Sequence, residues 1–390
     1  MKKILWISAI LVLPAYTPTQ ANAQSTIPVQ KSFQDWCLQK DTLPPDTRHT
    51  VEELLKVAET NDCQLGNEKL SKFEVLLISE ASISDLKPIA SMTNLHTLIL
   101  GSNKIIDLKP LVSLSNLRSL SLNNNKISNL EPLSGLTNIR TLFLNSNQIT
   151  DIKPIANLKR LINVDLNDNK ISDIQPLNKL SELDLLELAE NQISDLKPLY
   201  KSNLQKLRVI QLDLNPVKDL QPLVNLSNLQ NLTINNSPDI DIKPIAKLTN
   251  LSNLSLNGDR ISDLEPLASL TNLQYLNLNE NEISDVSPLA KVNTLLSLNL
   301  EHNRIENVEP LSNLTNLIGL YLQNNRIKDV SSLAKLTTLA GLYLENNQVR
   351  DIKALKDLTD LHCLYLYNNP ISPKVCPLKQ QSVCDFDDHL

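Results

Sequence analysis

The stretch that decides the fold is Leu95–Asn116, LHTLILGSNKIIDLKPLVSLSN, followed by Leu117–Asn138, LRSLSLNNNKISNLEPLSGLTN. The two segments align residue for residue, so the sequence repeats with a period of 22. With Leu95 as position 1, aliphatic residues recur at positions 1, 4, 6, 11, 14, 17 and 20. After a degenerate unit at Phe73, thirteen units start at Leu95, Leu117, Ile139, Leu161, Leu183, Leu207, Leu229, Leu251, Leu273, Leu295, Leu317, Leu339 and Leu361.

The pattern inside one unit predicts its local structure. Positions 3 to 7 alternate, which indicates a short strand with positions 4 and 6 inward and positions 3, 5 and 7 outward. Asparagine at position 9 can bond backbone groups where the chain turns inside. Proline at position 16, as in Pro110, fixes φ and starts a tight 3₁₀ return. The prediction is an α/β repeat solenoid with a curved parallel sheet on its concave face and short 3₁₀ or loop returns on its convex face.

Four segments are expected. Residues 1–23 have the features of a signal peptide: Lys2 and Lys3, the apolar run 4–13, and the small-residue site Ala21-Asn22-Ala23. An amphipathic N-terminal helix within the fold is the alternative interpretation. Residues 24–72 are expected to form an N-terminal helical cap, 73–369 the solenoid and 370–390 a C-terminal cap, because the end units need covers.

The five cysteines lie near the two ends of the array. Cys37 and Cys63 flank a helix expected near residues 51–59, and they are predicted to pair. Thr50 and Glu53 are predicted to form the capping box of that helix. In the C-terminal cap Cys376 is predicted to pair with Cys384, which leaves Cys363 over.

The repeat is irregular between residues 200 and 260. Two extra residues are expected around 200–202, Ser237 and Asp259 replace the asparagine of position 9, and Asp239 takes an isoleucine position. Simple drift of the repeat is favoured over a functional loop.

The phrase ISDLEPLASLTNL at residues 261–273 resembles the 22-residue leucine-rich repeats of bacterial internalins. The resemblance implies a leucine-rich-repeat solenoid with disulfide-stapled caps. The Cys-flanked helix and the KVCP…VC ending also resemble secreted cyanobacterial repeat proteins. The immunoglobulin-like module and wall-anchoring tail usual in internalins are not found, so host adhesion is not implied.

Outward positions near the C-terminal end carry most of the tyrosines. Three of them share position 5, so they should stack in one column, and tyrosine is favoured in binding hot spots. A cross-strand aromatic ladder that only stiffens the sheet is the alternative. The predicted partner-binding residues are Tyr275, Glu301, Tyr321, Tyr343, Glu345, Tyr365 and Tyr367.

Charge on the predicted concave face is negative. No Lys or Arg occupies positions 3, 5 or 7, whereas Asp165, Glu187 and Asp213 do, and the formal net charge is −6. Such a face favours a neutral or basic partner and disfavours nucleic acid. For any single acid, a merely solvated side chain is the simpler interpretation.

Catalysis has little support in the sequence. The five histidines lack metal-ligand spacing, and no phosphate-binding glycine loop or nucleophile motif is found. A solenoid surface is also expected to offer no pocket that shifts carboxylate pKa values. We therefore expect no enzyme activity, no metal and no cofactor.

Three functional hypotheses remain. The leading one is a secreted or periplasmic monomer that binds a protein partner on its concave face and does not insert into membranes. The second is a structural or adhesive envelope component that contacts cell-surface polysaccharide. The third, an intracellular solenoid that regulates an enzyme, requires an uncleaved N-terminus.

Overall fold

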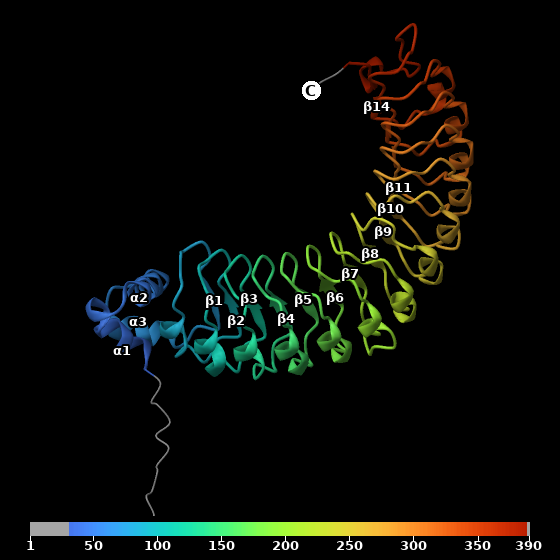
Figure 1. Cartoon of the computed structure of the whole chain (residues 1–390). Coiled ribbons are helices and arrows are strands. Elements are labelled where there is room, and N and C mark those ends of the chain that lie inside the picture. The colour runs from blue at the N-terminus through green and yellow to red at the C-terminus, as the bar shows by residue number, and fades with distance from the viewer. Residues whose placement is uncertain (1–30, 388–390) are drawn as a thin grey trace, which may run out of the picture.

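The computed structural model describes residues 31–387 as a curved array of stacked units (Figure 1). One open sheet of 15 parallel strands runs in sequence order from β1 to β15. The strands are β1 (Val75–Leu77), β2 (Thr97–Ile99), β3 (Ser119–Ser121), β4 (Thr141–Phe143), β5 (Asn163–Asp165), β6 (Leu185–Glu187), β7 (Val209–Gln211), β8 (Asn231–Thr233), β9 (Asn253–Ser255), β10 (Tyr275–Asn277), β11 (Ser297–Asn299), β12 (Gly319–Tyr321), β13 (Gly341–Tyr343), β14 (Cys363–Tyr365) and β15 (Cys384–Asp385).

Three helices precede the sheet, and short 3₁₀ segments make the returns. The helices are α1 (Phe33–Leu38), α2 (Pro45–Val57) and α3 (Cys63–Leu70). The returns run from η2 (Lys87–Ile89) to η14 (Lys353–Asp357) on the outer side of the curve (Figure 1). The strand, the turn and the 3₁₀ return of each unit therefore confirm the fold expected from the period of 22.

The figure also shows two arms that meet at a bend. We call β1–β6 the N-terminal arm and β10–β14 the C-terminal arm, and β7–β9 lie where they join (Figure 1). Both arms keep the same strand register, because each residue pairs with the residue one unit later, as Leu98 does with Leu120. The concave face is consequently continuous across the bend.

The core is a column of aliphatic side chains that runs through the units. In the unit from Leu117, all seven aliphatic positions are 0 or 1% exposed: Leu117, Leu120, Leu122, Ile127, Leu130, Leu133 and Leu136. The same positions are buried in most of the other units, with Asp239 at position 11 as an exposed exception, so inward and outward residues alternate as the sequence predicts.

Asparagines at position 9 tie the turns of neighbouring units together. The Nδ2 of Asn147 donates to the carbonyls of Leu122, Leu144 and Asn145 at 3.0, 2.9 and 3.2 Å. Its Oδ1 accepts from the N–H of Ile127 at 2.9 Å. The amide thus serves buried backbone groups in its own unit and in the one before, as expected for this position.

Position 8 holds a left-handed residue in every unit from Ser102 to Asn368, with φ between 51 and 71°. Asparagine and glycine adopt this conformation at low cost, and Asn124 and Gly258 are examples. Leu214 is an exception, because it is bulky, apolar and 50% exposed at φ 55°.

Replacing Leu214 by asparagine is expected to raise the free energy of unfolding by about 1 kcal/mol, since the left-handed strain is relieved. Chemical denaturation of the two proteins measures the difference. Leu77→Asn is a control, because Leu77 is also an exposed leucine, at 59%, but lies on a strand without a left-handed φ, and its replacement should not stabilise. A loss of stability in Leu214→Asn would contradict the strain argument.

The N-terminal helix differs from the prediction. The helix α2 begins at Pro45, where a proline suits the first helical position, and not near Val51. Thr50 lies inside the helix, and its hydroxyl donates to the carbonyl of Asp85 at 2.8 Å. The Thr50–Glu53 capping box is therefore wrong, and the capping box observed is that of Ser32 and Asp35 on α1. The predicted signal peptide, residues 1–23, lies outside the described residues.

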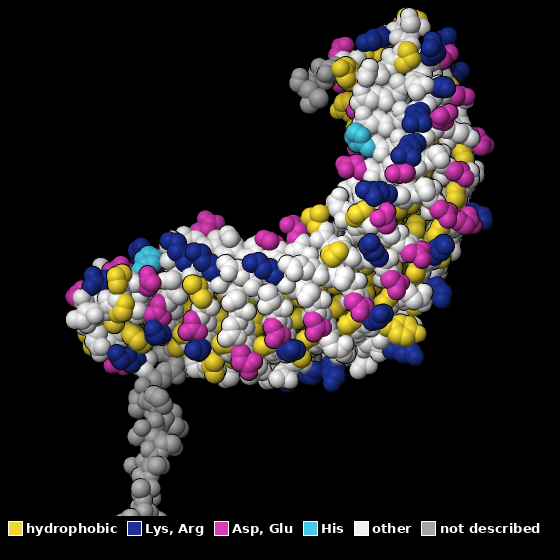
Figure 2. Space-filling view, in the orientation of Figure 1, with side chains coloured by type: hydrophobic (Ala, Val, Ile, Leu, Met, Phe, Trp, Pro, Cys, Tyr) yellow, Lys and Arg dark blue, Asp and Glu magenta, His cyan; other side chains and the backbone are white. Residues whose placement is uncertain are grey.

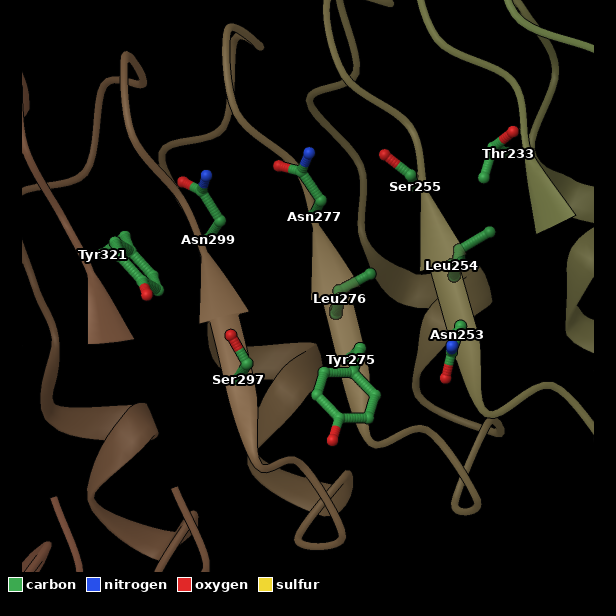
Figure 3. A pocket seen from close by; sticks show the side chains of 10 residues that line it. All are labelled: Thr233, Asn253, Leu254, Ser255, Tyr275, Leu276, Asn277, Ser297, Asn299 and Tyr321. Atoms are coloured by element: carbon green, nitrogen blue, oxygen red, sulfur yellow. The ribbon is translucent and has the colours of Figure 1, made fainter. Parts of the chain in front are cut away.

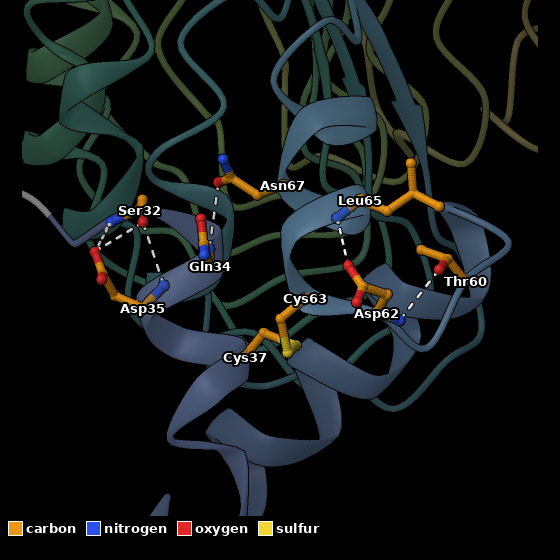
Figure 4. The surroundings of a disulfide bond; sticks show 9 residues. All are labelled: Ser32, Gln34, Asp35, Cys37, Thr60, Asp62, Cys63, Leu65 and Asn67. Carbon is orange, nitrogen blue, oxygen red and sulfur yellow. Dashed lines mark hydrogen bonds between the residues drawn. A yellow bond between two sulfur atoms is a disulfide. The ribbon is translucent and has the colours of Figure 1, made fainter.

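Two disulfides hold the ends of the array, as predicted. Cys37 on α1 joins Cys63 at the start of α3, with an S–S distance of 2.00 Å (Figure 4). Cys376 joins Cys384, and Cys363 is a free thiol. The second disulfide anchors β15, which pairs with β14 and adds a strand that the sequence did not predict.

Candidate functional site

The tyrosines at position 5 form a stack on the C-terminal arm. The ring centroids of Tyr321 and Tyr343 are 4.5 Å apart, and those of Tyr343 and Tyr365 are 5.0 Å apart. The rings are nearly parallel, with interplanar angles of 13 and 10°. The column predicted from the sequence is therefore present, and its rings are already ordered by one another.

Glycines at position 3 make room for this stack. A Cβ built on Gly319 would lie 3.3 Å from the ring of Tyr321, and one on Gly341 would lie 3.1 Å from the ring of Tyr343. Each ring therefore leans back over the glycine of its own strand. The Gly-Leu-Tyr triplet is the sequence signal for this arrangement, and it was missed.

The third strand of the stack has a cysteine in place of the glycine. The hydroxyl of Tyr343 lies 3.6 Å from the thiol of Cys363. This hydrogen bond, together with burial, raises the pKa of the Tyr343 hydroxyl, so the ring stays neutral over the physiological range. The stack is therefore an uncharged platform.

Two adjoining hollows lie on the concave face beside the stack. The first, of about 300 Å³, is shown in Figure 3, where Tyr275 and Tyr321 stand on either side of Ser297 and Asn299. The second, of about 430 Å³, continues toward His362 and shares Tyr275, Ser297 and Tyr321 with the first. The remaining lining residues are Thr233, Asn253, Leu254, Ser255, Leu276, Asn277, Leu296, Ile318, Gly319, Ala340, Gly341, Tyr343 and Cys363.

The lining of these hollows contains no Lys, Arg, Asp or Glu. It combines hydroxyl, amide, aromatic and aliphatic groups with the imidazole of His362 and the thiol of Cys363. Tyr275 is 49% exposed and is not part of the stack, so its ring is open to a ligand. The structure thus brings Tyr275, Tyr321 and Tyr343 together around one continuous depression.

The predicted acids lie outside that depression. Glu301 sits beside His302, with 3.4 Å between carboxylate and imidazole, and Glu345 is half-buried near the far end of the stack. Neither Glu301 nor Glu345 lines a hollow, and neither do Tyr365 and Tyr367. These two glutamates lie close to the tyrosine stack, so they can act on a ligand through their electrostatic potential rather than by direct contact.

Burial changes the titration of several concave acids, contrary to our expectation. Desolvation raises the pKa of Asp165, of Glu345 and of Glu187, and the charge of Asp165 raises that of Glu187 further. Asp165 and Glu187 are direct neighbours in the β5–β6 register. The sequence argument was wrong because packing of side chains across a sheet desolvates a carboxylate without any pocket.

The visible outer and lateral surface mixes both signs of charge. Figure 2 shows Lys and Arg interspersed with Asp and Glu along the whole array. Within residues 31–387, no helix is long and apolar enough to span a membrane. The same part of the chain contains no group of three or more His, Cys, Asp or Glu side chains placed to hold a metal ion.

The sequence matches the family model for leucine-rich repeats at residues 115–157, 137–179, 249–291, 293–335 and 337–377. No curated protein sequence matches the chain. Two solved structures, one of a plant receptor and one of a Leptospira protein, share the fold at less than 25% sequence identity. The plant peptide hormone receptor RGFR1 in complex with RGF2 is 22% identical, with a TM-score of 0.61 over 77% of this chain and 52% of the receptor.

The leucine-rich-repeat protein from Leptospira interrogans is 24% identical, with a TM-score of 0.63 over 82% of this chain and 97% of its own. Internalin InlF from Listeria monocytogenes is 31% identical, with a TM-score of 0.75 over 82% of this chain and 97% of InlF. This agreement extends over nearly all of InlF. The chain therefore belongs to the leucine-rich-repeat proteins of the internalin-like type.

Proposed function

We propose that the protein is a non-enzymatic scaffold that binds a protein partner through the concave face of its C-terminal arm. The observation that carries the proposal is the depression beside the tyrosine stack, whose lining contains no Lys, Arg, Asp or Glu. Tyrosine, serine, glycine and asparagine dominate its lining, and these residue types also dominate antibody paratopes. The stacked rings lose little conformational freedom on binding, which favours affinity.

The proposed partner is neutral or basic. The acids that border the depression, such as Glu301 and Glu345, favour approach of a positively charged surface and disfavour phosphate-rich ligands. The fold is compatible with such use, since the plant receptor with the same fold is in complex with RGF2.

We place the protein outside the cytoplasm, secreted or in a periplasm, as a monomer. Two disulfides support an oxidising compartment. The mass of the mature chain tests this placement: cleavage after Ala23 agrees with it, and an uncleaved N-terminus would favour the intracellular hypothesis.

Polysaccharide is the second candidate ligand. The absence of charged side chains from the lining and the open ring of Tyr275 suit the apolar faces and hydroxyl groups of sugars. Chemical identification of the bound ligand, as protein or as polysaccharide, distinguishes the two candidates.

Changing Tyr321, Tyr343 and Tyr365 together to serine is expected to weaken partner binding at least about thirtyfold, the scale of a hot-spot loss of about 2 kcal/mol. Immobilised residues 24–390 would capture the partner from envelope extract and culture medium of the producing organism. Mass spectrometry and glycan analysis would identify it, and calorimetry would give Kd for each variant.

Two further variants distinguish binding from stiffening of the sheet. Tyr275→Ser removes a ring of the depression that takes no part in the stack, so it should weaken binding without changing thermal stability. Tyr200→Ser is the matched control, because Tyr200 directly follows the η7 return (Lys197–Leu199), is 46% exposed and does not line the depression. If the triple serine variant and Tyr275→Ser both bind like the wild type, the concave site is refuted. If the retained material is polysaccharide, the second candidate is favoured.

A further inference from the structure

Position 9, which is asparagine in the regular units, holds a serine and then an aspartate in two consecutive units at the bend. Ser237 and Asp259 are each 1% exposed. The Oδ1 of Asp259 accepts from the N–H of Ser237 at 2.6 Å, and the hydroxyl of Ser237 donates to the carbonyl of Asn215 at 2.9 Å. The Oδ2 of Asp259 has no hydrogen-bond partner among the described residues.

Asp259 cannot make the hydrogen bonds that asparagine makes at position 9 of the next unit. There the Nδ2 of Asn281 donates to the carbonyls of Leu256, Leu278 and Asn279 at 2.7 to 3.1 Å. A carboxylate cannot donate, so an ionised Asp259 cannot give carbonyl groups the hydrogen bonds that the asparagine amide gives them, and it leaves a negative oxygen buried without a partner among the described residues. A protonated Asp259 has one O–H that can take the role of the asparagine amide.

The electrostatic surroundings favour the protonated form. Burial raises the pKa of Asp259 to about 7; the N–H of Ser237 opposes this shift and the charge of Asp213 adds to it. Asp239 and Arg260 flank the turn and pair with each other at 3.6 Å. Glu280 stands at position 8 of the following unit, and within residues 31–387 no Lys or Arg forms an ion pair with Asp259.

The units at the bend lack one of the backbone bonds that join regular units, although there the N–H of Asp241 donates to the carbonyl of Lys218 at 3.0 Å. In regular units the N–H of position 10 donates to the preceding unit, as Lys126 does to Ile105 at 2.9 Å. In three consecutive units the position holds Pro216, Pro238 and Arg260, and none of the three makes this bond within the described chain. The prolines have no N–H to donate.

Packing at the bend is correspondingly looser. Asp239 adopts φ 69° in place of the usual isoleucine, and Ile240 fills the core instead at 8% exposed. Ile242 and Ile261 are each 6% exposed, whereas most of the core is at 0%. All these features fall on β7–β9 and the turns after them, where the two arms join (Figure 1).

We propose that residues 215–261 form a proton-controlled joint between the arms, closed when Asp259 is protonated and locally open when Asp259 is ionised. Linkage between proton binding and closure sets the direction of the pH dependence. A carboxyl that binds its proton more tightly when the joint is closed stabilises the closed form at low pH. That stabilisation is complete below the ordinary carboxyl pKa, near 4, and is lost as pH rises toward 7. Mildly acidic surroundings therefore fix the angle between the arms, and mildly alkaline surroundings release it.

Amide hydrogen exchange tests the joint directly. Between pH 5.5 and 8.5, after correction for the intrinsic pH dependence, protection of residues 254–262 should fall at least about tenfold relative to residues 120–128. Asp259→Asn should remove this pH dependence, because asparagine is the regular residue of the position. Asp263→Asn is the matched control and should behave like the wild type, since Asp263 is exposed in the same unit and only accepts from Glu265.

Two results would overturn the proposal. One is equal relative protection of residues 254–262 at both pH values in the wild type, or an unchanged pH dependence in Asp259→Asn. The other is a carbon-13 titration of the wild-type Asp259 carboxyl with a midpoint near 4, which needs no variant. The joint does not depend on the identity of the partner, so its failure leaves the proposed function intact.

Discussion

Replacing Asn147 by alanine is expected to lower the free energy of unfolding by roughly 3 kcal/mol. The change removes the acceptor of the Ile127 N–H, which is buried and has no other partner in the turn. It also removes one donor from each of three carbonyls, although Leu122 and Leu144 keep a bond to the asparagine of an adjacent unit. Most of the cost therefore arises from the orphaned N–H.

Chemical denaturation followed by circular dichroism measures this loss. Asn145→Ala is the matched control, because it removes the same side chain two residues earlier, on the concave face, and it should change stability by less than about 0.5 kcal/mol. Because a solenoid can unfold in segments, hydrogen exchange in the neighbouring units should accompany the measurement. Equal effects of the two substitutions would mean that the buried amide is not a structural tie.

Removing the Cys37–Cys63 disulfide with a double serine variant is expected to cost about 3 to 4 kcal/mol, because the bond closes a loop of 26 residues in the unfolded chain. The disulfide joins α1 to α3 (Figure 4), and these helices belong to the cap that precedes the first unit, where α1 contacts the η2 return (Figure 1). Loss of the bond should therefore appear first as opening of the N-terminal cap.

Limited proteolysis and thermal unfolding under oxidising conditions report this opening. The Cys376–Cys384 pair spans only 8 residues, so its double serine variant should lose less, about 2.5 kcal/mol. Cys363→Ser should leave stability nearly unchanged, because that thiol is free. A smaller effect at Cys37 and Cys63 than at the C-terminal pair would show that loop closure is not the main contribution.

The fold could be predicted from the sequence because the same 22-residue pattern is repeated many times. Any one unit is ambiguous, but strand register, core positions and the role of asparagines such as Asn147 follow once the units are aligned. The tyrosine column followed for the same reason, since Tyr321, Tyr343 and Tyr365 share one position of the repeat.

Features that occur once were harder to predict. The helix α2 starts at Pro45, where proline suits the first helical position, so Thr50 lies inside the helix and its hydroxyl bonds the carbonyl of Asp85, which is distant in the sequence. The raised pKa of Asp165 and the lean of the rings over Gly319 depend on neighbours 22 residues away, not on the local sequence. The irregular stretch between residues 200 and 260 was noticed and attributed to drift of the repeat, but Pro216 and Pro238, which have no N–H to donate to the preceding unit, were not recognised as a signal of the bend.

The short strand β15 has a consequence for the behaviour of the protein in concentrated solution. An open parallel sheet ends in unpaired backbone groups, which can template the addition of another copy and lead to fibres. Cys384 and Asp385 cover β14, and the bond to Cys376 holds this two-residue strand in place. The exposed edge at that end is the two-residue strand β15, which is too short to pair with the sheet of a second copy. We therefore expect the C-terminal disulfide to protect also against end-to-end polymerisation.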